Sequence, residues 1–358
     1  MIRTLLFLVP DLNCHGWAKQ AMLLACALPK DQFGVHVGVL GEEGVFLEPL
    51  RAAGIPAHLF GARRLSAWFA LKRLLRQLSP ELVQTWGSAL PWAALAKMAR
   101  LGWPKWKLLA VDPPKDFWLG LADSVVVSAL QQVLENRHCH WHVIPPAVQN
   151  ASNPSAQDVS HRELALPEGA RYILCAGAIE KGHGFRVAVW IFDILQYIYP
   201  DLWLVIAGDG PERNAVEAFT RSRGWKENRV KFLGIRNDIP RLLEPAELVW
   251  VCGRHGGRNL ALEALAAGKP AVARYRPEFV ELLGEAETGF LVRSGRASDF
   301  AHASRRILDD PLLAHDFAEA ARNRAARFAL PRILKQWLDL YAEFFPQDDC
   351  NPPAILSR

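Results

Sequence analysis

The sequence predicts an α/β protein of two doubly wound, Rossmann-like domains that face a central cleft. Its 358 residues correspond to about two domains of typical size. Short apolar runs alternate with longer segments of helical period, which is typical of strand–helix–strand units and a parallel sheet. A segment rich in Asn, Ser, Pro and Gln, from Gln149 to Gly169, interrupts this alternation near the middle. We therefore expect domains over 1–150 and 170–328, with a linker over 151–169.

The elements follow in order from this alternation. In the first half, strands are expected at 2–9, 34–40, 81–86, 107–111, 124–128 and 142–148, and helices at about 17–28, 44–53, 66–78 and 90–101. In the second half, strands are expected at 172–176, 202–207, 230–233, 248–252, 270–273 and 290–292, and helices at about 185–197, 212–223, 259–267, 299–308, 317–328 and 331–345. Ligands of open parallel sheets bind beyond the carboxyl ends of the strands, so both halves should face the cleft.

Composition narrows the function classes. The net charge of +5 suits an anionic ligand or a membrane surface, but it falls short of the clustered basic surface that binds nucleic acid. Six dispersed cysteines without a C-x-x-C pair indicate reduced thiols in the cytoplasm. The apolar start is too short for a signal peptide, and no apolar run reaches the length of a membrane span. We expect a cytoplasmic protein that binds no nucleic acid.

The most informative stretch runs from Cys252 to Pro270. A strand ends at Cys252, a glycine-rich turn follows, and a helix begins near Asn259. The backbone N–H groups of such a turn can hold a phosphate. Glu263, in the first turns of this helix, can accept hydrogen bonds from a ribose diol. A Gly-Gly turn alone is equally typical of a tight turn without a ligand.

In the second half, three further predicted strands end in glycine-containing segments, which we call glycine exits. The exits are Ala176–Gly184, which contains Lys181, then Ile206–Glu212 and Phe232–Arg236. Four such exits line one edge of the predicted sheet, which favours an anion site there over four unrelated turns.

The order of these motifs resembles the donor domain of family 4 glycosyltransferases. The motifs are Gly177-x-x-x-Lys181-Gly, Ala207-Gly-Asp-Gly-Pro, Phe232-Leu-Gly, His255-Gly-Gly-x₅-Glu263-Ala-Leu-Ala-Ala-Gly-Lys-Pro and Glu287-Thr-Gly-Phe-Leu-Val. The segment Leu12–Gln20 resembles the family's glycine loop. The resemblance implies the GT-B fold, an acceptor-side first domain, a donor-binding second domain, and a last helix over 329–346 that crosses back to the first. It also implies sugar transfer with retention from a nucleotide-diphospho-sugar, in cell-surface polysaccharide or glycoconjugate synthesis.

The resemblance also implies site residues. Lys181 and His255 are the expected catalytic residues, and Glu263 the ribose ligand. The expected donor contacts are Gly16, Gly177, Lys181, Gly208, Gly234, Ile235, His255, Gly256, Gly257, Arg258, Asn259, Leu260 and Glu263. His15 and Trp86 are expected to contact donor or acceptor. The expected co-substrate is a sugar linked to UDP or GDP. No other cofactor and no metal are expected.

Three departures put the chemistry in question more than the fold. His255 stands where the family has a glutamate, Ala178 stands where it commonly has an arginine, and the segment 86–91 contains no histidine. His255 or Arg258 could supply compensating charge. The departures leave open a non-catalytic nucleotide-sugar-binding relative and, less favoured, an epimerase of the same fold, which would need carboxylates in the cleft.

Two further features have competing interpretations. Arg137–His142 holds three histidines and a cysteine, but alternating strand residues point to opposite faces, which argues against a metal site. Ala62–Leu78 is basic and amphipathic. A helix packed on the sheet with a solvated charged rim is the favoured interpretation, and a peripheral contact with the inner face of a membrane, where a lipid-linked acceptor would lie, is the alternative.

Overall fold

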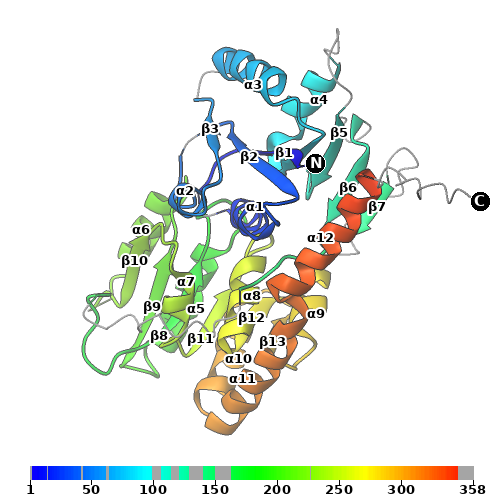
Figure 1. The fold of residues 1–358 in the computed structure, drawn as a ribbon. Coiled ribbons are helices and arrows are strands. Elements are labelled where there is room, and N and C mark those ends of the chain that lie inside the picture. The colour runs from blue at the N-terminus through cyan, green and yellow to red at the C-terminus, as the bar shows by residue number, and fades with distance from the viewer. Residues whose placement is uncertain are drawn as a thin grey trace, which may run out of the picture.

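The computed structural model describes residues 2–13, 15–41, 43–61, 64–98, 106–113, 121–128, 140–149, 163–225 and 227–345. These residues form two open, all-parallel sheets, each covered by helices on both faces (Figure 1). The predicted fold class, two doubly wound α/β domains, is confirmed.

The first sheet has the strand order β3-β2-β1-β4-β5-β6-β7. Its strands are β1 (Arg3–Val9), β2 (Phe33–Val39), β3 (Ala57–Leu59), β4 (Leu82–Trp86), β5 (Lys107–Val111), β6 (Ser124–Val127) and β7 (His140–Val143). Helices α1 (Gly16–Ala27) and α2 (Leu47–Ala52) pack on one face, and α3 (Arg64–Leu78) and α4 (Leu90–Met98) pack on the other. The nearly continuous apolar runs of these strands are explained by burial on both faces.

The second sheet has the order β10-β9-β8-β11-β12-β13. Its strands are β8 (Arg171–Ala176), β9 (Leu202–Ala207), β10 (Val230–Gly234), β11 (Leu248–Val251), β12 (Ala271–Arg274) and β13 (Gly289–Val292). One face is covered by α7 (Ile239–Leu243), α8 (Arg258–Ala267), α9 (Pro277–Leu283) and α11 (Pro311–Ala325). The other is covered by α5 (Phe185–Leu195), α6 (Arg213–Arg221) and α10 (Ala297–Leu308).

The strand order reverses direction between β1 and β4 in the first sheet and between β8 and β11 in the second. Such switch points leave a crevice at the carboxyl ends of the flanking strands, because the two connections run to opposite sides. The segments that follow β1, β4, β8 and β11 therefore meet between the domains.

Helix α12 (Leu330–Phe344) belongs to the core of the first domain, although it follows the second in sequence (Figure 1). Ile333, Trp337 and Tyr341 are buried there, and the Tyr341 hydroxyl lies 2.6 Å from the Gln84 side-chain oxygen, to which it donates. Where α12 starts, Leu330 donates to the carbonyl of Val148 over 2.9 Å. The two chain crossings between the domains thus run side by side.

Several element boundaries differ from the sequence-based expectation. The strand expected at 142–148 is observed at His140–Val143, because Pro145 and Pro146 have no N–H to donate to a sheet ladder. Helix α11 starts at Pro311 rather than Phe317, since the Asp310 carboxylate caps it by accepting from the next two free backbone N–H groups. The short elements β3, α7 and α9 were not anticipated. Part of the expected linker, 151–162, lies outside the described residues.

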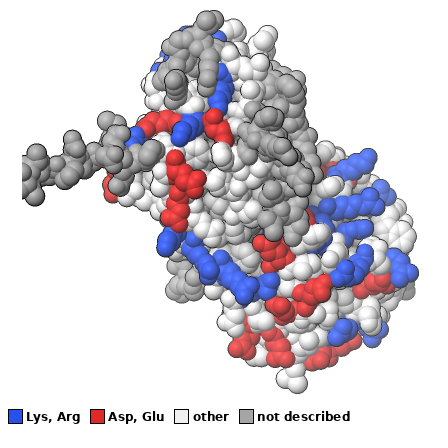
Figure 2. Space-filling model, turned by 90° about the vertical axis from the view of Figure 1, so that its right-hand side faces the viewer, with Lys and Arg blue, Asp and Glu red and all other residues white. Residues whose placement is uncertain are grey.

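Charges of both signs lie side by side on the surface. Figure 2 shows Lys and Arg next to Asp and Glu on one face of the molecule. The ion pairs of the second domain include Arg324 with Glu287, at 2.6 Å, and Arg293 with Glu285, at 2.5 Å. Within the described ranges, no helix combines the length and apolar character needed to cross a bilayer.

Candidate active site

A cleft of about 480 Å³ opens between the two domains, at the carboxyl ends of both sheets. The first domain lines it with the turn after β1, which contains His15, and with Trp86 at the end of β4. The second domain lines it with the turns after β8 and β11. The cleft is thus built from the four segments that the switch points bring together.

The turn after β11 leads directly into α8. Gly256 and Gly257 have φ angles of 68° and 78°, in the left-handed region that favours glycine. A Cβ on Gly257 would lie 2.2 Å from Cγ1 of Val251, so a side chain does not fit there. The first residues of α8, Arg258 and Asn259, line the cleft. Because the first N–H groups of a helix have no intrahelical partner, this end of α8 is suited to an anion.

Glu263 lies on α8 with only 8% of its side chain exposed. Its Oε1 accepts from the ammonium of Lys19, on α1 of the first domain. Its Oε2 is buried and has no hydrogen-bond partner among the described residues. A buried carboxylate oxygen without a donor is uncommon, and a ligand hydroxyl would satisfy it.

A second, smaller cavity of about 50 Å³ reaches Glu263. Gly177 and Gly208 line it at the ends of β8 and β9, and Arg236 and Asn237 line it just after β10. The Arg236 guanidinium is held by Asp238 through two hydrogen bonds of 2.7 and 2.5 Å. The cavity therefore has a fixed polar wall beside a buried carboxylate.

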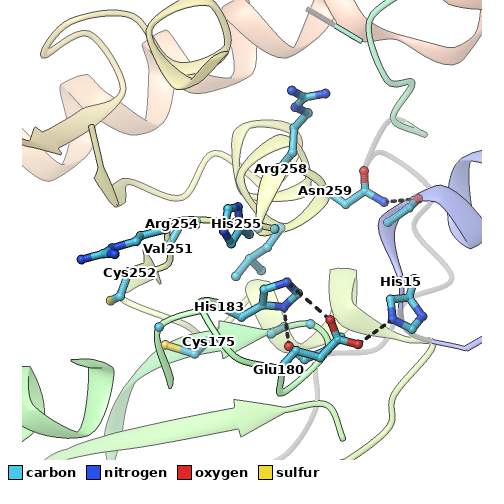
Figure 3. A pocket seen from close by; sticks show the side chains of 18 of the residues that line it. His15, Cys175, Glu180, His183, Val251, Cys252, Arg254, His255, Arg258 and Asn259 are labelled. Atoms are coloured by element: carbon cyan, nitrogen blue, oxygen red, sulfur yellow. Dashed lines mark hydrogen bonds and ion pairs between the residues drawn. The ribbon is translucent and has the colours of Figure 1, made fainter. Parts of the chain in front are cut away.

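His15 lies between two carboxylates, one from each domain. Its Nδ1 is 3.2 Å from Asp11, and its Nε2 is 3.0 Å from Glu180 of the turn after β8 (Figure 3). The hydrogen bond to Asp11 contributes most to raising the pKa of His15 to about 9, the one to Glu180 adds to this, and burial opposes both. The imidazole is therefore protonated at neutral pH, and it stacks on Trp17.

Glu180 also faces His183 on the same turn. The Nε2 of His183 is 3.8 Å from the Glu180 carboxylate, and its Nδ1 lies 2.6 Å from the carbonyl of Ala178, to which it can donate (Figure 3). The turn that carries the sequence departure at Ala178 thus places a carboxylate in the cleft, where the family pattern implies a cation.

A group of arginines surrounds the turn after β11. Arg276, which follows β12, donates to the carbonyl of Gly256 over 2.5 Å and to that of Arg254 over 3.2 Å. Burial, and secondarily the positive charges of Arg258 and Arg274, lower the pKa of Arg276 to about 10, against the attraction of Glu278. The Arg258 guanidinium donates to the hydroxyl of Ser128 in the first domain. The Arg276 guanidinium therefore holds the backbone of this turn from outside.

Comparison with known proteins identifies the second domain. Residues 156–324 match the profile of the family described as Glycosyl transferases group 1. The chain carries a group 1 glycosyl transferase domain. This family is the family 4 to which the sequence motifs point, so the predicted resemblance is confirmed for residues 156–324.

Curated relatives and solved structures agree with this group 1 assignment. The lipopolysaccharide core biosynthesis glycosyltransferase LpsD of Rhizobium meliloti is 25% identical over 289 residues, which cover 78% of this chain and 80% of LpsD. The putative glycosyltransferase EpsD of Bacillus subtilis is 27% identical over 156 residues, which cover 43% of this chain and only 41% of EpsD. The crystal structure of Anabaena HepE in complex with UDP-glucose has a TM-score of 0.78 at 20% identity, and the match covers 95% of this chain and 99% of HepE. That likeness shows the shared GT-B fold.

Most of the predicted site residues, from both domains, meet at the two cavities. Those that line the main cleft are His15, Gly16, Trp86, Gly177, His255, Gly256, Gly257, Arg258, Asn259 and Leu260. Gly208 and Glu263 line the smaller cavity.

Three predicted residues line neither cavity. Lys181 has an exposed side chain, and its neighbour Glu180 faces the cleft in its place. Gly234 ends β10 and Ile235 follows it, but the next residues, Arg236 and Asn237, form the wall. The catalytic role assigned to Lys181 stays a prediction that this geometry does not favour.

Sequence reasoning missed four residues that shape the cleft: Lys19, Glu180, His183 and Arg276. Lys19 lies in the segment Leu12–Gln20, and Glu180 and His183 lie in the glycine exit Ala176–Gly184, but nothing in the sequence assigned them a role. The contacts of Lys19 and Glu180 depend on how the two domains meet. Of the motif Arg137–His142, residues 137–139 lie outside the described ranges. In the described part of the chain, no three His, Cys, Asp or Glu side chains converge as metal ligands.

Proposed function

We propose that this group 1 glycosyl transferase moves a sugar from a nucleotide-diphospho-sugar to a hydroxyl of a glycan or lipid-linked acceptor, with retention of configuration. The observation that carries the proposal is the carboxylate of Glu263. It is buried at the wall of a cavity beside a glycine turn and a helix N-terminus, and one oxygen lacks a partner. A ribose hydroxyl supplies the donor that this oxygen lacks.

The base, ribose, diphosphate and sugar of the donor bind one after another, from the smaller cavity to the main cleft. The base lies against Arg236 and Asn237, and the ribose binds Glu263. The diphosphate lies at the start of α8, where the first N–H groups have no intrahelical partner and the helix dipole favours negative charge. The sugar points along the main cleft toward His255 and Trp86. HepE was crystallised with UDP-glucose, which makes UDP-linked hexoses the first donors to test.

Catalysis by these residues consists of stabilising the leaving group. The bond between the anomeric carbon and the diphosphate oxygen breaks while the acceptor hydroxyl bonds to the same carbon from the same face. The proton of the hydroxyl passes to the departing diphosphate. The N–H groups of the turn and the positive charge of His15 stabilise the negative charge that develops on the diphosphate.

The acceptor enters from the first domain. On α3, the buried residues Ala67, Leu71 and Leu75 pack on the sheet, while Leu65 and Phe69 are 77% and 67% exposed. Basic side chains on the same helix accompany the exposed pair, an arrangement that suits the surface of an anionic membrane. LpsD acts in lipopolysaccharide core synthesis, which supports a glycan on a membrane lipid as the acceptor class.

The test combines binding with turnover. Thermal shifts with UDP, GDP and their sugars identify the nucleotide, and an assay for donor hydrolysis and transfer follows with the donors that bind. The proposal is supported if the wild type releases nucleoside diphosphate and Glu263→Gln does not. Binding without release would instead favour a non-catalytic relative, and a free C2 epimer would favour an epimerase.

A further inference from the structure

Two ion pairs join the domains across the cleft, and in both the cation comes from the first domain. Lys19 on α1 pairs with Glu263 on α8, and His15 pairs with Glu180 at 3.0 Å. Asn259 donates to the carbonyl of Gly16 over 2.9 Å between the same two helices. The seam between the domains therefore runs through the proposed ribose ligand.

The arginines that the second domain brings to the main cleft, Arg254, Arg258 and Arg276, do not line the smaller cavity beside Glu263. Ala178 provides no cation where the family commonly has an arginine, and Lys181 is exposed outside both cavities. Of the cations that line the smaller cavity, Arg236 is held by two hydrogen bonds to Asp238. Lys19 lines the same cavity, next to Gly177 and Gly208, with 17% of its side chain exposed. The cation available there therefore comes from the opposite domain.

Donor binding changes which anionic group can pair with the Lys19 ammonium. Ribose hydroxyls that donate to Glu263 compete with the Lys19 ammonium for the same carboxylate. The α-phosphate is one ester linkage from that ribose, so it arrives within the reach of a flexible four-carbon side chain. A phosphate is a stronger partner for an ammonium than a carboxylate already shared with two hydroxyls.

We infer that Lys19 is a diphosphate-binding residue of the donor site, which exchanges Glu263 for phosphate when the ribose binds. This inference rests on the proposed function. The first domain then contributes to donor binding as well as to acceptor binding, and the cleft is complete for a nucleotide only when α1 lies against α8.

Calorimetric titration of the full chain with uridine and UDP tests the inference, with guanosine and GDP added if the protein prefers guanine. In Lys19→Gln the affinity for UDP should fall about ten-fold, because a charge-assisted hydrogen bond is lost. The affinity for uridine should stay within about two-fold, because Glu263 keeps its ribose. Lys19→Arg should retain most of the preference for UDP. Lys97→Gln is the matched control, because Lys97 pairs with Asp123 at 2.5 Å in the first domain, outside the cleft.

The outcomes separate this inference from the proposed function. Equal losses of affinity for uridine and UDP in Lys19→Gln would mean that Lys19 only holds the two domains together. Tighter UDP binding would mean that Lys19 competes with the nucleotide for Glu263. Either result, or no change, overturns the inference alone. If the wild-type protein binds none of the four ligands, the proposed function falls as well. Melting temperatures of all variants establish that each is folded.

Discussion

The two domains contribute to the same cleft in different ways. The second domain offers backbone, namely glycine turns with left-handed φ angles and the start of α8, together with side chains close to these turns in sequence, such as Glu263. The first domain offers side chains, namely His15, Lys19 and Trp86. Backbone sites need particular residue types at fixed spacing, whereas side chains that reach across a cleft can come from any position that the fold brings near. The donor half was therefore readable as motifs, whereas in the first domain the sequence indicated His15 and Trp86 but not Lys19.

Replacing the ribose ligand is the strongest test of the donor half. Glu263→Gln should weaken nucleotide binding on the order of 100-fold, because two hydrogen bonds to a charged acceptor, worth about 1.5 kcal/mol each, are weakened. Titration with the preferred nucleoside diphosphate measures the change. Glu281→Gln, an exposed glutamate of the same domain, serves as the control and should bind like the wild type. Unchanged binding in Glu263→Gln would remove the ribose assignment.

Because the donor half of the cleft is built from backbone turns, adding a single methyl group to one of these glycines should change stability strongly. Gly257→Ala should lower the free energy of unfolding by about 2 kcal/mol, because alanine is strained at φ 78° and its Cβ would overlap Val251. Gly54→Ala, with φ 70° in the first domain but nothing within 4 Å of its Cβ, isolates the strain and should cost less. Chemical denaturation compares the two variants, and equal losses would show that the contact with Val251 does not matter.

The same contrast explains what sequence alone predicted. The alternation of apolar runs gave both sheets, since strands buried on both faces must be apolar throughout. It missed β3, α7 and α9, which have 3, 5 and 7 residues and are too short for a period to be recognised. The positions of Glu263 and of the turn around Gly257 followed from spacing along one strand–turn–helix unit. Lys19 and Glu180 could not be found that way, because their partners lie 244 and 165 residues away.

The pH dependence of stability tests the side chains that the first domain contributes to the contact between the domains. The pKa of His15 is raised above its ordinary 6.5 to about 9 by Asp11 and Glu180, so its stabilisation is complete below about pH 6.5 and is lost as the pH rises through 9. We expect the wild type to lose about 1 kcal/mol of stability between pH 7 and 9.5, discounting for partial exposure. The titratable groups that face His15 are Asp11 and Glu180, and His183 lies near Glu180.

Thermal melts of the wild type and His15→Gln across this range measure the effect. The loss should be absent or much smaller in His15→Gln, since glutamine does not titrate. A matched control is His302→Gln, on α10 of the second domain and away from the cleft. Parallel curves for the wild type and His15→Gln would show that the pair with Glu180 contributes nothing to joining the domains.

The smallest expected effect compares exposed aromatic residues of the two domains. Phe69 on α3 and Tyr197 after α5 are 67% and 78% exposed, but only the first accompanies the amphipathic face proposed to meet a membrane. Phe69→Glu should reduce co-sedimentation with vesicles that contain anionic lipid a few-fold, because it removes apolar contact and adds a repelled charge. Tyr197→Glu adds the same charge elsewhere and should bind as the wild type does. Equal losses in both variants would reduce the effect to net charge, and wild-type binding that does not depend on anionic lipid would exclude α3 as a membrane contact.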